Sequence, residues 1–148
     1  MVSSKGQSKG CLATFVECKT RFYVAIKMDD RTKDSMFLVI SSLYNTLTSK
    51  LLKTFTVDRG KEFACFEQVE SEFGIPMYFA DAYAAWQRGS NENSNGLLRE
   101  FFPKKTDLAK VTLDKLTEAL VLINNRPRKC LGFKTPFDMF KHEIKKLI

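Results

Sequence analysis

The 148-residue chain has few of the residues that build thiolate sites or disulfide frameworks, and it has no long apolar run. It contains a single histidine, His142, and four cysteines without a close paired spacing. This usage argues against a zinc site and favours a reduced, intracellular protein. No apolar stretch approaches the roughly 18 residues that span a bilayer, and the polar first ten residues lack the apolar core of a signal peptide. We therefore expect one cytoplasmic domain without a membrane partner.

Basic residues exceed acidic ones in this chain. The 24 Lys and Arg and the 17 Asp and Glu give a net charge of +7. Lys and Arg neutralise phosphates and release counterions, so the charge favours a polyanionic partner such as nucleic acid. A protein that is merely basic is the alternative, and charge alone does not choose between the two. Hydrophobic residues make up 44% of the chain, which is enough for one domain to bury a core.

The hydrophobic pattern alternates between the periods of strands and helices. Apolar runs at 11–18 and 21–28 predict a hairpin closed by Lys19 and Thr20. Further strands are expected at 53–57 and 76–80. Predicted helices begin near Asp34, Phe63, Ser90, Leu113 and Thr135, with Gly74 ending the second and Pro136 opening the last. The resulting order, β-β-α-β-α-β-α-α-α, favours an α/β fold with mixed strand directions and flanking helices.

Two carboxylates stand where catalytic groups often collect. Asp58 directly follows the predicted strand 53–57, and ligands gather at the carboxyl ends of strands in open α/β sheets. Asp-Arg-Gly is also ordinary turn chemistry, so Asp58 by itself is not decisive. Glu92 lies in the first turn of a predicted helix, where a carboxylate also complements the helix dipole.

The helix that begins near Ser90 gives Glu92 a polar setting. At 100° per residue, Asn95, Gly96 and Arg99 share its face, and the leucines of the helix lie opposite. The residues between Asp58 and Glu92 form a helix, a strand and a loop, which allows the two carboxylates to meet. Carboxylates that meet need a hard cation such as Mg²⁺, and two such ions can activate a water or a 3′-hydroxyl and stabilise a leaving oxygen.

Four stretches of the chain resemble one family of proteins. They are ATFVECKTRFYVAIKM (13–28), TVDRGKEF (56–63), YFADAYAAWQRGSNENSNGLLREFFPKKTDL (78–108) and INNRPRKCLGFKTPFDMF (123–140). They resemble the IS-thirty family of insertion-sequence transposases, within the integrase-core superfamily. The resemblance implies a ribonuclease-H-like fold, a DDE triad with two Mg²⁺ or Mn²⁺ ions, and DNA cleavage followed by strand transfer. It matches Asp58 to the second triad position and Glu92 to the third.

The first triad position has no match in this chain. In the family this Asp lies on the central first strand, shortly before the segment that resembles residues 2–10, and this chain opens at that point. Glu17 lies at the wrong end of the hairpin to replace it, and the acids at 29, 30 and 34 follow the hairpin. We therefore expect residues 1–148 to be an N-terminally truncated core that lacks most or all of the first strand and does not cut DNA as it stands.

Basic and amide side chains around the loop before Glu92 are predicted to contact DNA phosphates. The predicted DNA-binding residues are Lys61, Arg88, Asn91, Asn95, Arg99, Arg126, Arg128 and Lys129. A solvated surface is the alternative for these residues. Trp86 either stacks on a base or anchors its loop in the core.

Metal-dependent DNA transposition is the leading interpretation, and a homo-oligomer is compatible with it. Two others stay open. One is a DNA-binding remnant without catalysis, which the missing Asp favours. The other is a ribonuclease-H-like nuclease that acts on another substrate.

Overall fold

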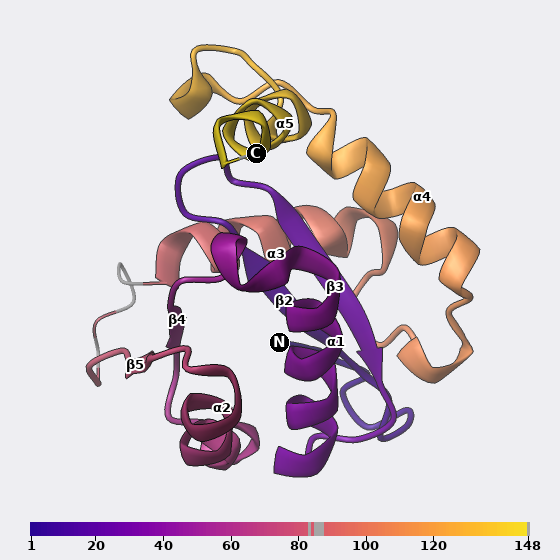
Figure 1. Cartoon of the computed structure of the whole chain (residues 1–148). Coiled ribbons are helices and arrows are strands. Elements are labelled where there is room, and N and C mark those ends of the chain that lie inside the picture. Colours follow the sequence, from indigo (N-terminus) through magenta and orange to yellow (C-terminus); the bar gives the residue numbers. More distant parts are fainter. Residues whose placement is uncertain (83, 85–87, 148) are drawn as a thin grey trace. The chain divides into compact units, whose positions relative to one another are not determined.

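The computed structural model describes residues 1–82, 84 and 88–147, and Figure 1 shows the course of the chain. The chain forms two compact units. The first unit combines Met1–Lys27 with Ser90–Ile148, and the second is Met28–Gly89. The second unit is therefore one continuous segment between the two parts of the first. None of the described helices is long and apolar enough to cross a membrane.

A three-stranded sheet forms the base of the first unit, in the order β1 (Val2–Ser3), β2 (Cys11–Val16) and β3 (Tyr23–Met28). β1 runs antiparallel to β2, with Val2 opposite Leu12. The two strands of the predicted hairpin are confirmed. The loop between them consists of residues 17–22, so it is longer than the predicted two residues.

The side chain of Glu17 explains the longer loop. Its carboxylate accepts hydrogen bonds from the N–H groups of Lys19 and Thr20 at 3.0 and 2.6 Å, and from Thr20 Oγ1 at 2.6 Å. Burial opposes ionisation of Glu17, but these hydrogen bonds outweigh it, so the net shift of its pKa is downward. A turn built by a side chain does not follow the loop-length rule on which the prediction rested.

Helices cover the sheet of the first unit. They are α3 (Gly89–Phe101), η3 (Leu108–Lys110), α4 (Leu113–Asn124), η4 (Lys129–Leu131) and α5 (Pro136–Leu147). α3 contributes Leu98 to the hydrophobic core and α4 contributes Ile123, and both residues are fully buried together with Leu12 of β2. The predicted start of the last helix is confirmed, because Thr135 Oγ1 accepts a hydrogen bond from the N–H of Asp138 at 3.1 Å.

The second unit is built around a short parallel pair of strands. Its elements are α1 (Lys33–Leu51), β4 (Phe55–Val57), η1 (Lys61–Cys65), α2 (Phe66–Phe73) and β5 (Met77–Phe79). α1 packs on η1 and α2, and Tyr44 of α1 stacks on Phe73 at 4.7 Å between ring centroids. Gly74 ends α2 as predicted, with φ of 65°, whereas the predicted helix start at Phe63 lies inside the 3₁₀ segment η1. The mixed α/β fold is confirmed, with its strands divided between two sheets.

α5 is attached to the loop between β2 and β3 by one stacked pair and one ionic cluster. The rings of Phe22 and Phe140 stack at 4.3 Å. The Glu143 carboxylate accepts hydrogen bonds from Lys19 Nζ at 2.7 Å and from Lys146 Nζ at 2.9 Å. These two bonds lower the pKa of Glu143 to about 2.

We predict that the attachment of α5 weakens in acid. The pKa of Glu143 is depressed from its ordinary value of 4.5, so its ionised form contributes stability above pH 4.5 that is lost as the pH falls to about 2. Glu143→Gln should therefore reduce the pH dependence of unfolding in this window, as measured by urea denaturation. Asp114→Asn is the control, since Asp114 is exposed in the first turn of α4. Equal pH dependence in the wild type and Glu143→Gln would contradict the prediction.

Candidate active site and nucleic-acid interface

Asp58 directly follows β4 in the second unit, as the sequence predicts. Its Oδ1 accepts a hydrogen bond from the N–H of Gly60 at 3.0 Å, which closes the turn after the strand. Its Oδ2 lies 2.9 Å from Arg88 Nη1, and 38% of the Asp58 side chain is exposed. The strand-end carboxylate is therefore accessible and already attracts a cationic group.

The buried carboxylate of Glu62 packs against this turn. Glu62 is fully buried, and its Oε1 accepts a hydrogen bond from Arg31 Nη2 at 2.9 Å. Its Oε2 is buried without a hydrogen-bond partner among the described residues. A Cβ at Gly60 would lie 2.6 Å from that oxygen, so the Glu62 carboxylate packs directly against the turn that carries Asp58.

Glu62 and Arg31 were not among the predicted site residues. One signal in the sequence points to Glu62. It continues the apolar helical stripe formed by Phe66, Val69 and Phe73, where a carboxylate is out of place unless it has a partner. No comparable signal marks Arg31, which reaches Glu62 from the turn before α1.

Glu92 lies in the first turn of α3, in the first unit. It is exposed, and it makes no hydrogen bond or ion pair with the described residues. Gly96, one turn along, is exposed as well. The predicted outward face of the helix is therefore correct for these two residues, and the carboxylate of Glu92 is exposed there.

Two of the amides on α3, those of Asn91 and Asn95, bond to the sheet, whereas Asn93 is exposed. Asn91 Oδ1 accepts a hydrogen bond from Thr14 Oγ1 of β2 at 3.4 Å. Asn95 Oδ1 accepts one from the hydroxyl of Tyr23, in β3, at 2.6 Å. Burial raises the pKa of the Tyr23 hydroxyl, which keeps it protonated as the donor. The expectation that Asn95 shares the outward face of Glu92 is wrong, because a buried hydroxyl on the sheet needs this acceptor.

Arg99 lies one helical turn beyond Asn95, and its side chain bonds to β1. Its Nη2 donates to the carbonyl of Ser3 at 2.9 Å, and its Nη1 donates to the carbonyls of Phe102 and Pro103 at 3.2 and 3.3 Å. Burial lowers the pKa of the Arg99 guanidinium. Arg99 thus has an internal role at the end of α3, and contacts of Asn91, Asn95 and Arg99 with DNA stay predictions.

The basic segment after α4 lies beside the outer row of α3. Arg126 Nη2 lies 3.0 Å from Glu100 Oε2, and Glu100 stands two turns along α3 from Glu92. The Nε and Nη2 atoms of Arg128 are buried without partners among the described residues, and burial and the neighbouring Arg126 lower its pKa. Lys129 is exposed. Arg126 is therefore placed beside Glu100 of α3, and contacts of Arg126, Arg128 and Lys129 with DNA stay predictions.

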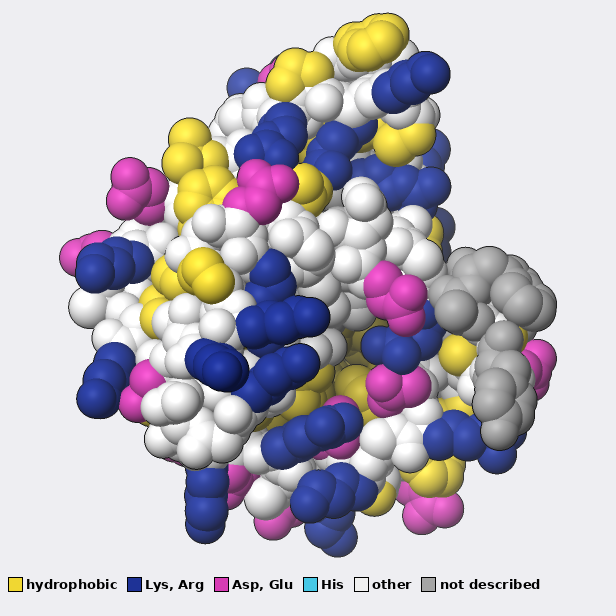
Figure 2. Space-filling model, turned by 180° about the vertical axis from the view of Figure 1, so that it is seen from behind, with side chains coloured by type: hydrophobic (Ala, Val, Ile, Leu, Met, Phe, Trp, Pro, Cys, Tyr) yellow, Lys and Arg dark blue, Asp and Glu magenta, His cyan; other side chains and the backbone are white. Residues whose placement is uncertain are grey.

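The remaining predictions belong to the second unit or fall outside the described residues. Lys61 is exposed at the start of η1, and Arg88 is held by Asp58. Trp86 lies outside the described residues. Figure 2 shows Lys and Arg side chains gathered in groups on the face that it presents. Asp58 and Glu92 belong to different units, so their meeting at one metal stays a prediction. Within the described part of the chain, no group of three or more His, Cys, Asp and Glu side chains could hold a metal ion.

Known transposases are similar in sequence to this chain over most of its length. The chain is 37% identical over 139 residues to the transposase InsI of insertion sequence element IS30A from Escherichia coli, which covers 94% of this chain and 36% of that protein. The chain is homologous to the IS-thirty family of transposases. It is also 45% identical over 94 residues to the transposase of element IS4351 from Bacteroides fragilis, covering 64% of this chain and 29% of that protein. No protein-family model matches the chain.

The homology to transposases covers only part of those proteins, since the chain spans about a third of their length. The fold has solved counterparts. The catalytic core domain of BIV integrase matches with a TM-score of 0.69 at 19% identity, over 94% of this chain and 97% of that one. The HTLV-2 integrase catalytic core domain, solved in complex with magnesium, matches with a TM-score of 0.66 at 19% identity, over 90% and 86%. The predicted family resemblance and ribonuclease-H-like fold class are confirmed.

We predict that Gly60 and Glu62 are energetically coupled. Gly60→Ala should lower the free energy of unfolding by about 1–3 kcal/mol, because the new Cβ meets a buried carboxylate that cannot easily move. In a Glu62→Ala background the same change should cost less than about 0.5 kcal/mol, since φ of −67° at Gly60 suits alanine. Gly96→Ala is the control. It has open space around its Cβ and should stabilise α3 by about 0.5–1 kcal/mol. Equal costs of Gly60→Ala in both backgrounds, from chemical denaturation, would refute the coupling.

Proposed function

We propose that this chain is the catalytic-core part of a DNA transposase, which cleaves and joins DNA strands with divalent metal ions in the bacterial cytoplasm. The observation that carries the proposal is the similarity to transposases across 94% of the chain. In this proposal Asp58 and Glu92 are metal ligands.

The chemistry of the two carboxylates fits a hard divalent cation. Mg²⁺ prefers oxygen ligands, and both side chains are accessible to solvent. Glu92 has no competing partner among the described residues. Asp58 attracts the guanidinium of Arg88, which shows that this position favours positive charge. When bound, Mg²⁺ or Mn²⁺ supplies stabilisation of the attacking and leaving oxygens in phosphodiester chemistry.

The residues of the chain have distinct tasks in this proposal. Glu62 positions the turn of Asp58 from its buried site beside Gly60. Arg126, Arg128 and Lys129 offer positive charge to DNA phosphates from the segment after α4, where Arg126 lies beside Glu100 of α3. Lys61 and Arg88 would do so in the second unit, where Arg88 would compete with a bound cation for Asp58.

We predict that strand cleavage depends on both carboxylates. The assay is Mn²⁺-dependent cleavage of a duplex that carries the ends of the element encoding the chain. It uses the chain itself, which we expect not to cleave because it lacks the first triad Asp, and a version extended by the residues encoded upstream, in which the variants are compared. Asp58→Asn and Glu92→Gln should each reduce cleavage on the order of 100-fold or more, because each removes a metal-binding oxygen charge.

The controls for this assay are Asp114→Asn and Glu118→Gln, two exposed acids of α4 without ion pairs to the described residues. Both should cleave like the parent. Cleavage that survives Asp58→Asn and Glu92→Gln would refute the assignment of the ligands. DNA binding without metal-dependent cleavage in either form would leave a DNA-binding function alone.

We also predict that Arg88 competes with metal for Asp58. Arg88→Gln should tighten Mn²⁺ binding about two- to fivefold, because a partly exposed ion pair of this kind contributes about 1 kcal/mol. Electron paramagnetic resonance of free Mn²⁺ measures the affinity without requiring activity. Arg59→Gln is the matched control. It removes the same charge from an exposed neighbour that makes no ion pair with the described residues. Equal tightening in the two variants would show a general charge effect and exclude competition.

A further inference from the structure

We propose that five lysines at the end of α3 remote from Glu92 form a second phosphate-binding surface, which holds duplex DNA about four to six base pairs from Glu92. The inference rests on the proposed function for the identity of its polyanion. The lysine surface consists of Lys5, Lys9, Lys104, Lys105 and Lys110, which are all exposed and all belong to the first unit.

The positive charge of the lysine surface is almost uncompensated within the segments that carry it. These segments, residues 4–10 and 102–111, contain one acid, Asp107. Its Oδ1 accepts a hydrogen bond from Ser8 Oγ at 2.5 Å. Its Oδ2 lies 3.8 Å from Nζ of Lys110, whose side chain remains 85% exposed. The acid is thus used to join the two segments, and the lysines keep their charge for a partner.

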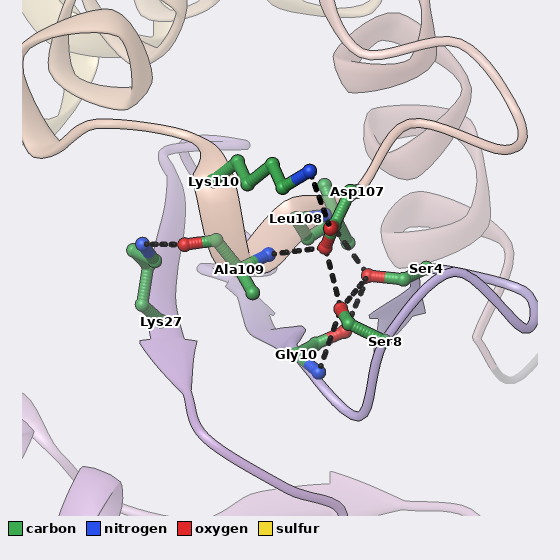
Figure 3. Close-up of polar contacts among 8 residues, drawn as sticks. All are labelled: Ser4, Ser8, Gly10, Lys27, Asp107, Leu108, Ala109 and Lys110. Carbon is green, nitrogen blue, oxygen red and sulfur yellow. Dashed lines mark hydrogen bonds and ion pairs between the residues drawn. The ribbon is translucent and has the colours of Figure 1, made fainter.

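A network of buried hydrogen bonds fixes the two segments against each other, as Figure 3 shows. Ser4 Oγ donates to the carbonyl of Gly10 at 2.7 Å and accepts from the N–H of Leu108 at 2.9 Å. A Cβ at Gly10 would lie 2.7 Å from the nitrogen of Ala109, so the backbones are in direct contact. Lys27, which belongs to β3, donates a hydrogen bond from its Nζ to the carbonyl of Ala109 at 3.1 Å. The lysines therefore extend from a preorganised frame, which lowers the ordering cost of binding.

Two of the lysines occupy backbone positions that favour glycine. Lys5 has φ of 47° and Lys105 has φ of 77°, both in the left-handed region. A lysine in this region strains the backbone, and glycine would relieve the strain. The fold retains a positive side chain at both positions despite this strain, which is consistent with a use for the charge at the surface.

The geometry of α3 sets the distance between Glu92 and the lysine surface. From Glu92 to the last helical residue, Phe101, the helix rises about 14 Å at about 1.5 Å per residue. A DNA duplex advances about 3.4 Å per base pair, so this length corresponds to about four base pairs, and the lysines of the following turn extend it. A duplex that lies along α3 and contacts Glu92 would therefore reach the end of the helix where the lysine segments begin.

The residue type points to the phosphate backbone as the ligand. Lysine is a flexible point charge that binds a phosphate oxygen from any direction, whereas reading base edges relies on planar, bidentate groups such as arginine. The surface contains only lysines, so we expect binding that is independent of DNA sequence and sensitive to salt.

The test measures DNA affinity in the full chain by fluorescence anisotropy with a duplex of about 20 base pairs across a salt series. The triple variant Lys104→Gln, Lys105→Gln and Lys110→Gln should lose affinity at least tenfold and reduce the salt slope by about 2.7. The control variant, with the exposed lysines at 134, 141 and 145 changed to glutamine, has the same net charge and should change less than about twofold. Equal losses in the two variants would overturn the proposal, as would tighter binding to polyglutamate than to the duplex.

A photo-cross-linking arm tests the distance. A photoreactive amino acid replaces Glu92 in one variant and Lys105 in another, with an element-end duplex as the probe. Cross-links mapped about four to six base pairs apart support the proposal. Coincident cross-links, or none from position 105, would overturn it.

The two proposals fail separately in these experiments. Loss of binding in the triple variant, together with no metal-dependent cleavage, would sustain the lysine surface and remove the catalytic proposal. Parental binding in the triple variant, together with cleavage that requires Asp58, would do the reverse.

Discussion

The attachment of α3 to the sheet is the constraint on which the first unit depends. Asn91, Asn95 and Arg99 follow one another at intervals of four residues, and each bonds to a different strand, β2, β3 and β1. Hydrogen bonds to buried groups are directional and costly to leave unmade, so they fix the rotation of the helix more closely than apolar packing does. With that rotation set, Glu92 and Glu100 face outward, and Arg126 approaches from the neighbouring segment.

A different logic governs the second unit, where Asp58 is held by its own turn. The turn is supported by a buried carboxylate and stays compact because Gly60 has no side chain. The two proposed ligands therefore reach their positions by independent means, one through a helix locked onto a sheet and one through a turn above a buried acid. Each carboxylate can therefore be oriented by its own unit without the other. The proposed chemistry requires both carboxylates to be correctly oriented at the same time.

Much of the fold is readable from the sequence because it follows from local rules. Gly74 and Thr135 end and begin helices through backbone chemistry within a few residues, and the structure confirms both. The orientation of Asn95 could not be read in this way. Polarity alone places an amide toward solvent, and only the tertiary position of the Tyr23 hydroxyl reverses that. Glu62 is similar, since its partner comes from a turn about thirty residues earlier in the chain. Contacts of this kind depend on topology, which local pattern does not encode.

The insertion of the second unit between the two parts of the first has a consequence for biosynthesis. Residues 28–89 are continuous, so they can complete their packing soon after they leave the ribosome. β2 and β3 are made earlier, yet they bury Leu12 and Tyr23 against α3 and α4, which are made after the second unit. These two strands therefore keep their apolar face exposed until the later helices are made. Interactions of high sequence separation close slowly, so the sheet under α3 is the segment most in need of chaperone protection during synthesis.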